Sequence, residues 1–170
     1  MENYIALLHA VNVGGTGKLP MTELKALCDG LGFIGARTYI ASGNVVFKSD
    51  KSAKAVKSAL EKALEGHMGK PVGVQVRGAP EMQAVFDNNP FPGREGSRTL
   101  AVFTDAPPPA DTAVTATGRD TEEIMLGARE VYVYFPDGMG RSKLKIAPMK
   151  VGTGRNMNTV AKLAAMAADL

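Results

Sequence analysis

The sequence predicts an α+β protein, and three patterns within residues 1–78 support that fold class. Residues 4–11 are apolar at both alternating sets of positions, which is typical of a central strand covered on both faces. Ser42 and Gly43 separate two short strand-like runs and suit the tight turn of a hairpin. Two segments with apolar residues at helical spacing alternate with these strands. The resulting order, strand, helix, strand, strand, helix, strand, is that of ferredoxin-like domains, in which a four-stranded antiparallel sheet carries both helices on one face.

The elements of this first half follow one another closely. They are a strand at 4–11, a loop at 12–20, a helix with the apolar stripe Leu24, Leu27, Cys28 and Leu31, strands at 37–41 and 44–48, a helix at 52–67 and a strand at 72–77. Gly30 and Gly32 close the first helix. We therefore assign residues 1–78 to one ferredoxin-like subdomain.

Residues 79–170 repeat the alternation of helices and strands loosely and form a second α+β subdomain. The expected elements are a helix opening at Pro80, a strand at 99–103, a helix at 110–116, a hairpin of 122–126 and 130–135, and a final helix with Val160, Leu163, Ala164 and Ala167 on its buried face. No strand is expected in the glycine-rich segment before the final helix, and Asn158 is the expected N-cap. The two halves share no sequence repeat.

Composition is that of an ordinary globular protein. The 170 residues are 45% hydrophobic and 22% charged, and the net charge of +3 is too small to indicate nucleic-acid binding by itself. The single cysteine, Cys28, fits a reducing compartment. The N-terminus lacks the basic segment and cleavage pattern of a signal peptide, and no apolar run approaches the roughly 20 residues that span a bilayer. We therefore expect a cytoplasmic protein with no membrane partner, and the oligomeric state stays open.

The most unusual chemistry lies in residues 136–159, which combine basic and amide side chains with four glycines. No acidic residue follows Asp137 in this stretch, and its polar members include Arg141, Ser142, Lys143, Lys145, Lys150, Arg155, Asn156 and Asn158. This composition predicts anion binding, because free N–H groups at a helix N-terminus, the positive helix end and a guanidinium can meet at one place. We expect Arg155 beside the N-terminus of the final helix, sharing an anion with Lys143 or Arg141.

Structural roles compete with binding at several of these positions. The segment 152–158 is also interpreted as a flexible loop whose Asn158 caps the helix, although a cap leaves Arg155 unexplained. Lys162 lies off the buried stripe of the helix and is either a solvated lysine or a ligand contact. Tyr132 and Tyr134 share one face of a sheet, where packing is favoured over the stacking of bases.

The loop NVGGTGKLP at 12–20 matches a nucleotide-binding loop only in part. Asn12 stands where the first glycine of a P-loop belongs, and Leu19 follows Lys18 where the magnesium-binding hydroxyl belongs. Pro20 takes the place of the third glycine of the dinucleotide fingerprint. A structural turn is therefore favoured, with Asn12 and Lys18 as the residues that can face a ligand.

Candidates for catalysis are few. The two histidines lie far apart in the sequence, no metal-ligand spacing is present, and no cofactor is expected. Ser142 and Lys143 suggest a nucleophile and a base only because they are adjacent. An enzyme that acts on a small anionic substrate would use Lys143 or Lys18 for electrostatic stabilisation and Ser142 or Asn44 for positioning.

Five motifs, NVGG, TYIASGNVVF, NPFP, PDGMGRSKL and RNMNTV, occur in this order, and with them the chain resembles the bacterial family of unknown function DUF1697 over nearly its full length. The resemblance implies an α+β fold of ferredoxin-like character and a family whose biochemical activity is not established. His9, Ala10 and Met157 depart from the Arg, Gly and Trp that are usual in the family, so a family site that used that Arg or Trp would bind differently here. The residues that match the motifs are mostly polar or basic: Asn12, Lys18, Ser42, Gly43, Asn44, Arg141, Ser142, Lys143, Arg155, Asn156, Asn158 and Lys162.

The leading hypothesis is a binding protein that holds a phosphate-bearing ligand, either a nucleotide or a nucleic acid, at a polar, basic cleft. The expected ligand contacts are Asn12, Lys18, Ser42, Asn44, Arg141, Ser142, Lys143, Arg155, Asn156, Asn158 and Lys162. Two alternatives stay open, an enzyme that acts on a small anionic substrate and a protein–protein interaction module.

Overall fold

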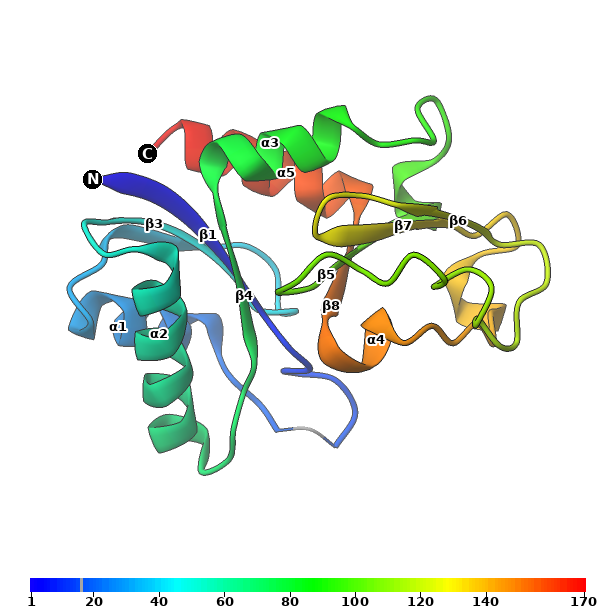
Figure 1. Cartoon of the computed structure of the whole chain (residues 1–170). Coiled ribbons are helices and arrows are strands. Elements are labelled where there is room, and N and C mark those ends of the chain that lie inside the picture. The colour runs from blue at the N-terminus through cyan, green and yellow to red at the C-terminus, as the bar shows by residue number, and fades with distance from the viewer. Residues whose placement is uncertain (16) are drawn as a thin grey trace. The chain divides into compact units, whose positions relative to one another are not determined.

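The computed structural model describes residues 1–15 and 17–170 and divides them into two compact units (Figure 1). Unit 1 comprises residues 1–82 and 163–170, and unit 2 comprises residues 83–162. Each unit contains one four-stranded antiparallel sheet. The predicted α+β class is therefore confirmed.

Unit 1 has the predicted order of elements. They are β1 (Glu2–Leu8), α1 (Met21–Gly30), β2 (Ile34–Thr38), β3 (Asn44–Ser49), α2 (Ala53–Met68) and β4 (Val74–Gly78), followed by α3 (Ala79–Asp87) at the boundary with unit 2. The strands lie in the order β2-β3-β1-β4, and every neighbouring pair is antiparallel. This arrangement is consistent with the ferredoxin-like prediction.

The hydrophobic core of unit 1 lies between its sheet and the helices α1 and α2, which run side by side (Figure 1). The stripes predicted from helical spacing supply the buried side chains, such as Leu24 and Cys28 from α1 and Leu60 from α2. The rings of Phe33 and Phe47 stack with their centroids 4.3 Å apart. Burial of the Cys28 thiol raises its pKa to about 12, so this cysteine is a core side chain and not a reactive one.

Two strands of unit 1 end earlier than predicted because the backbone turns. The strand expected at 4–11 is β1 and ends at Leu8, and Ala10 and Asn12 then adopt positive φ values of 49° and 56°. The strand expected at 37–41 is β2 and ends at Thr38, before Ile40 with a φ of 48°. Left-handed backbone conformations at these residues cannot continue a strand.

Unit 2 has the same strand order as unit 1, because β6-β7-β5-β8 are arranged as β2-β3-β1-β4. Its elements are β5 (Thr99–Phe103), β6 (Glu123–Leu126), β7 (Glu130–Tyr134), α4 (Pro148–Val151), β8 (Thr153–Asn156) and α5 (Met157–Ala168), the last turns of which belong to unit 1. The predicted residues Val160, Leu163, Ala164 and Ala167 of α5 are all buried. The loose similarity expected of the second half is thus a shared sheet topology.

Three details of unit 2 correct the sequence-based prediction. The helix expected at 110–116 is only turns, because the hydroxyls of Thr112 and Thr115 donate to the carbonyls of Pro109 and Asp111 and close the backbone locally. The helix α4 and the strand β8 stand where only a glycine-rich loop was expected. At Gly152 an added Cβ would lie 2.2 Å from the carbonyl oxygen of Phe103, so this glycine lets the chain approach β5 and begin β8.

Tyr132 packs inside unit 2, as favoured from the sequence. Its hydroxyl donates to the carbonyl oxygen of Val85 at 2.7 Å, and the side chain is buried. Tyr134 lies under the guanidinium of Arg94, at 4.6 Å from the ring centroid.

In the described part of the chain, no helix combines the length and apolar character needed to cross a membrane.

Candidate functional site

A pocket of about 430 Å³ in unit 2 brings together three of the predicted site residues, Arg141, Ser142 and Lys143. We call it the charged pocket. Its lining consists of Gly118, Asp120, Thr121, Glu122, Phe135, Asp137, Gly138, Arg141, Ser142 and Lys143. It therefore combines two basic and three acidic side chains with two hydroxyls.

The pocket forms where backbone hydrogen bonds join the loop at Thr117 to the loop at Lys145. Thr117 and Lys145 make an isolated antiparallel bridge, in which each N–H donates to the carbonyl of the other at 3.0 and 2.8 Å. Gly118 adjoins this bridge with a φ of 66° and lies so close to Lys143 that an added Cβ would be 2.1 Å from its carbonyl oxygen. On the other side, the turn after β7 uses Gly138 with a φ of 86° and leads into the short 3-10 helix Met139–Arg141.

Glu122 accepts a hydrogen bond on each of its carboxylate oxygens within the pocket. The Ser142 hydroxyl donates to Glu122 Oε2 at 2.7 Å, and the Asp120 N–H donates to Glu122 Oε1 at 2.6 Å. These hydrogen bonds lower the pKa of the Glu122 carboxyl, and that of Ser142 has the larger effect. Glu122 is therefore an ionised carboxylate held in place, although only 6% of its surface is exposed.

A second hydroxyl–carboxylate pair lies at the rim of the same pocket. The Thr121 hydroxyl donates to Asp137 Oδ2 at 2.7 Å, and both residues are exposed. The cations Arg141 and Lys143 are exposed as well, so a molecule in the pocket meets both signs of charge.

The acidic half of the pocket was missed by sequence reasoning. Asp120, Thr121 and Glu122 lie about twenty residues before Ser142 and in no recognisable motif. The basic stretch was judged by its own residues, which hold no acid after Asp137. The polar run RDTE at 119–122, whose Glu122 begins the strand predicted at 122–126, is the one signal from which these residues could have been found.

The predicted site residues of unit 1 are largely engaged in holding turns. Asn12 donates from Nδ2 to the carbonyls of Leu19 and Ala41, at 2.9 and 2.7 Å, and accepts from the Leu19 N–H at 2.7 Å. Asn44 is fully buried and donates to Ser42 Oγ at 2.9 Å. These contacts stabilise the loop before α1 and the turn before β3.

Lys18 is the exception among the unit 1 candidates, since its side chain is exposed. It lines a separate pocket of about 400 Å³ together with Asn12, Leu19 and Met21. The structure therefore does not gather Asn12, Lys18, Ser42 and Asn44 into one site of their own, since only Asn12 and Lys18 line this pocket.

The N-cap of α5 is not the residue expected. Asn156, and not Asn158, caps the helix, because its Oδ1 accepts from the Thr159 N–H at 2.9 Å. Asn158 is exposed and lines a third pocket of about 420 Å³ with Phe86, Arg94 and Met157. Lys162 is exposed on the same helix.

Arg155 lies in β8, where it pairs with Ala101 of β5, and only 6% of its surface is exposed. Its guanidinium donates to Thr153 Oγ1 at 2.8 Å and to the Gly154 carbonyl at 2.9 Å. Burial lowers the pKa of Arg155 to about 10. It is not among the side chains that line the charged pocket with Arg141 and Lys143, and a shared anion stays a prediction.

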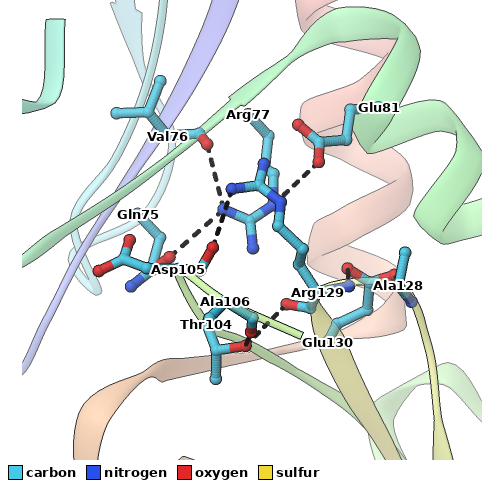
Figure 2. A network of polar contacts seen from close by, with 10 residues as sticks. All are labelled: Gln75, Val76, Arg77, Glu81, Thr104, Asp105, Ala106, Ala128, Arg129 and Glu130. Carbon is cyan, nitrogen blue, oxygen red and sulfur yellow. Dashed lines mark hydrogen bonds and ion pairs between the residues drawn. The ribbon is translucent and has the colours of Figure 1, made fainter. Parts of the chain in front are cut away.

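Sequence reasoning also passed over Arg77, a second buried arginine, in unit 1. Its side chain donates to the oxygen of Gln75 at 3.3 Å and to the Val76 carbonyl at 3.1 Å, and its Nε lies 3.7 Å from the carboxylate of Glu81 (Figure 2). The polar residues at 75 and 77 alternate with valines in β4, which was the available signal. These contacts tie the buried Arg77 guanidinium to β4 and α3, and we assign it a structural role.

Figure 2 also draws a group in unit 2 that fixes the turn between β6 and β7. The Thr104 hydroxyl donates to the carbonyl of Arg129 at 3.1 Å, and the Glu130 carboxylate accepts from the backbone of Ala128 and Arg129 at 3.2 Å each.

No set of three or more His, Cys, Asp and Glu side chains in residues 1–15 and 17–170 is arranged to hold a metal ion.

Comparison with known proteins identifies a matching family model and a solved structure with a similar fold. A family model described as a protein of unknown function (DUF1697) matches residues 1–132. The structure of the conserved bacterial protein SP0830 from Streptococcus pneumoniae is similar, with a TM-score of 0.79, 23% sequence identity and coverage of 98% of each chain. The comparison with curated proteins gives no match.

Proposed function

This chain belongs to the DUF1697 family of proteins of unknown function, and from that premise we propose that it binds a small phosphate-bearing molecule in the charged pocket of unit 2. The observation that carries the proposal is the convergence of Arg141 and Lys143 on one pocket with the hydroxyl of Ser142. Arginine binds phosphate oxygens through paired N–H groups, and lysine binds them as a point charge. The volume of about 430 Å³ is typical of sites for small molecules.

The acidic residues of the pocket favour a small ligand over a nucleic acid. A polyanion would place several phosphates near Asp120, Glu122 and Asp137 at once. Two like charges 4 Å apart repel by about 1 kcal/mol in water and about 4 kcal/mol near a protein surface. A single phosphate group can instead lie at the basic residues and stay away from the carboxylates.

The Ser142 hydroxyl is better suited to binding than to nucleophilic attack. A nucleophilic serine needs a neighbour that takes its proton, and Glu122 is that neighbour. A carboxylate with a lowered pKa is a weak proton acceptor. We therefore assign the Ser142–Glu122 pair to the organisation of the pocket.

Isothermal titration with adenosine 5′-monophosphate and with inorganic phosphate tests the proposal. Arg141→Ala and Lys143→Ala are each expected to weaken binding by about 1.5 to 3 kcal/mol, the loss of a hydrogen bond to a charged group, or about 10- to 150-fold. Lys145→Ala is the matched control, because it removes the same charge from an exposed residue that does not line the pocket.

Two results would contradict the proposal. Absence of binding by both ligands at low salt would remove the phosphate site. An equal loss of affinity in Lys145→Ala and Arg141→Ala would show that binding follows the overall charge of the basic stretch and not the pocket.

A further inference from the structure

We infer that the charged pocket selects phosphate esters that carry free hydroxyl groups, such as a sugar phosphate or a ribonucleotide, with the phosphate at Arg141 and Lys143 and the hydroxyls at Glu122 and Asp137. This inference rests on the proposed function and adds the chemical class of the ligand. It follows from the acidic half of the pocket, which an anion-binding site does not need.

The carboxylates demand hydrogen-bond donors from whatever occupies the pocket. An ionised carboxylate accepts hydrogen bonds at about four positions and donates none. Glu122 uses at least two of these positions, for Ser142 and Asp120, and Asp137 uses at least one, for Thr121. A phosphate ester without hydroxyls would leave the remaining acceptor positions facing its own oxygens, whereas a polyol fills them with O–H donors.

The pocket holds at least one of these carboxylates in a fixed position before a ligand arrives. Glu122 is buried, and hydrogen bonds to both of its oxygens set its orientation. A preorganised acceptor binds a hydroxyl without the entropic cost of ordering a free side chain. Asp137 is exposed and is oriented by the Thr121 hydroxyl, which makes it the more replaceable of the two.

Neutral hydroxyls fit this environment better than an ammonium group does. Arg141 and Lys143 line the same pocket, and the positive charge of Arg119 acts on Glu122, since it contributes to the lowered pKa of that carboxyl. These three cations repel an ammonium ion. A hydroxyl donates to the carboxylates without that repulsion.

Titration calorimetry with ribose 5-phosphate and ethyl phosphate separates hydroxyl recognition from phosphate recognition, because ethyl phosphate carries the same charged group and no hydroxyl. We expect ribose 5-phosphate to bind at least about tenfold more tightly, the value of one to two good hydrogen bonds. Asp137→Asn and Glu122→Gln should reduce this preference while ethyl phosphate binds as before or more tightly. Circular dichroism checks that each variant is folded. If Glu122→Gln does not fold, the exposed Asp137→Asn still provides the test.

Each outcome bears on one proposal. Equal affinities for ribose 5-phosphate and ethyl phosphate would overturn the inference and leave the phosphate site standing. Tighter binding of phosphoethanolamine than of ribose 5-phosphate would also overturn it, because the carboxylates would then select an ammonium group. If none of the three phosphate esters binds, the proposed function itself fails.

Discussion

Replacement of Gly118 by alanine should damage the charged pocket from below. The φ of Gly118 is 66°, and its added Cβ would lie 2.1 Å from the carbonyl oxygen of Lys143, a backbone atom that cannot move without its loop. The left-handed conformation costs a residue with a side chain about 1 to 2 kcal/mol. Separation of the loops would also break the two hydrogen bonds between Thr117 and Lys145, each worth about 1 kcal/mol. Gly118→Ala should therefore destabilise unit 2 by about 3 to 4 kcal/mol.

Gly140→Ala is the matched control, because no atom lies within 4 Å of its added Cβ and its φ is not in the left-handed range. Urea unfolding followed by circular dichroism gives the change in free energy. Hydrogen exchange of peptides that contain Thr117 and Lys145 reports the bridge locally, and both amides should exchange faster in Gly118→Ala only. If the two variants are equally stable and the bridge amides stay protected in both, the loops are not held together as we describe.

Three further predictions concern buried polar groups. In the folded protein the pKa of Glu122 lies below its ordinary value of 4.5. Its contribution to the free energy of unfolding is therefore fully present above pH 4.5 and is lost as the pH falls through the folded-state pKa. When unfolding is measured over a series of acidic pH values, the wild type should lose stability more steeply than Glu122→Gln. Tyr132→Phe should cost about 1 to 3 kcal/mol in urea unfolding, because the buried carbonyl of Val85 loses its donor; an unchanged midpoint would mean that water replaces the hydroxyl. Arg155→Ala should lower stability by about 2 kcal/mol while phosphate affinity stays unchanged, whereas the exposed Lys150→Ala changes neither. Weaker phosphate binding in a stable Arg155→Ala protein would instead support the anion role that the sequence predicts.

Unit 1 could be predicted because its signals are local. The apolar stripes of α1 and α2 repeat at helical spacing, and Ser52 caps α2 by accepting from the Ala55 N–H as a serine at that position usually does. What the local pattern could not fix was the point at which strands end. That point depends on single backbone conformations, such as the positive φ of Ile40, which a β-branched residue rarely adopts.

Unit 2 was harder because its decisive contacts join distant residues. The segment around Gly154 has no strand propensity of its own, and it becomes β8 because β5 supplies hydrogen-bond partners about fifty residues away in the sequence. The contact between Ser142 and Glu122 likewise exists only once two loops meet. A sequence-based search for anion sites therefore located the basic half of the charged pocket and missed the acidic half, whose one local signal was the polar run at 119–122.

Neighbouring asparagines show a finer limit of the same kind. Both Asn156 and Asn158 are good helix caps by type, and the pattern of apolar residues favoured Asn158. The cap lies two residues earlier because β8 ends at Asn156, whose side chain is then placed to accept from the Thr159 N–H. The cap is thus decided by where the strand ends.

The shared strand order has a consequence for synthesis of the chain. In each sheet the central strand, β1 or β5, has one neighbour from a hairpin and one from the last strand of its series, β4 or β8. Until the chain has been made past Asn156, β5 presents a bare row of N–H and C=O groups along one side. Its sequence there, Leu-Ala-Val-Phe, is apolar. The nascent or truncated protein therefore exposes an aggregation-prone strand edge, which β8 covers in the complete fold.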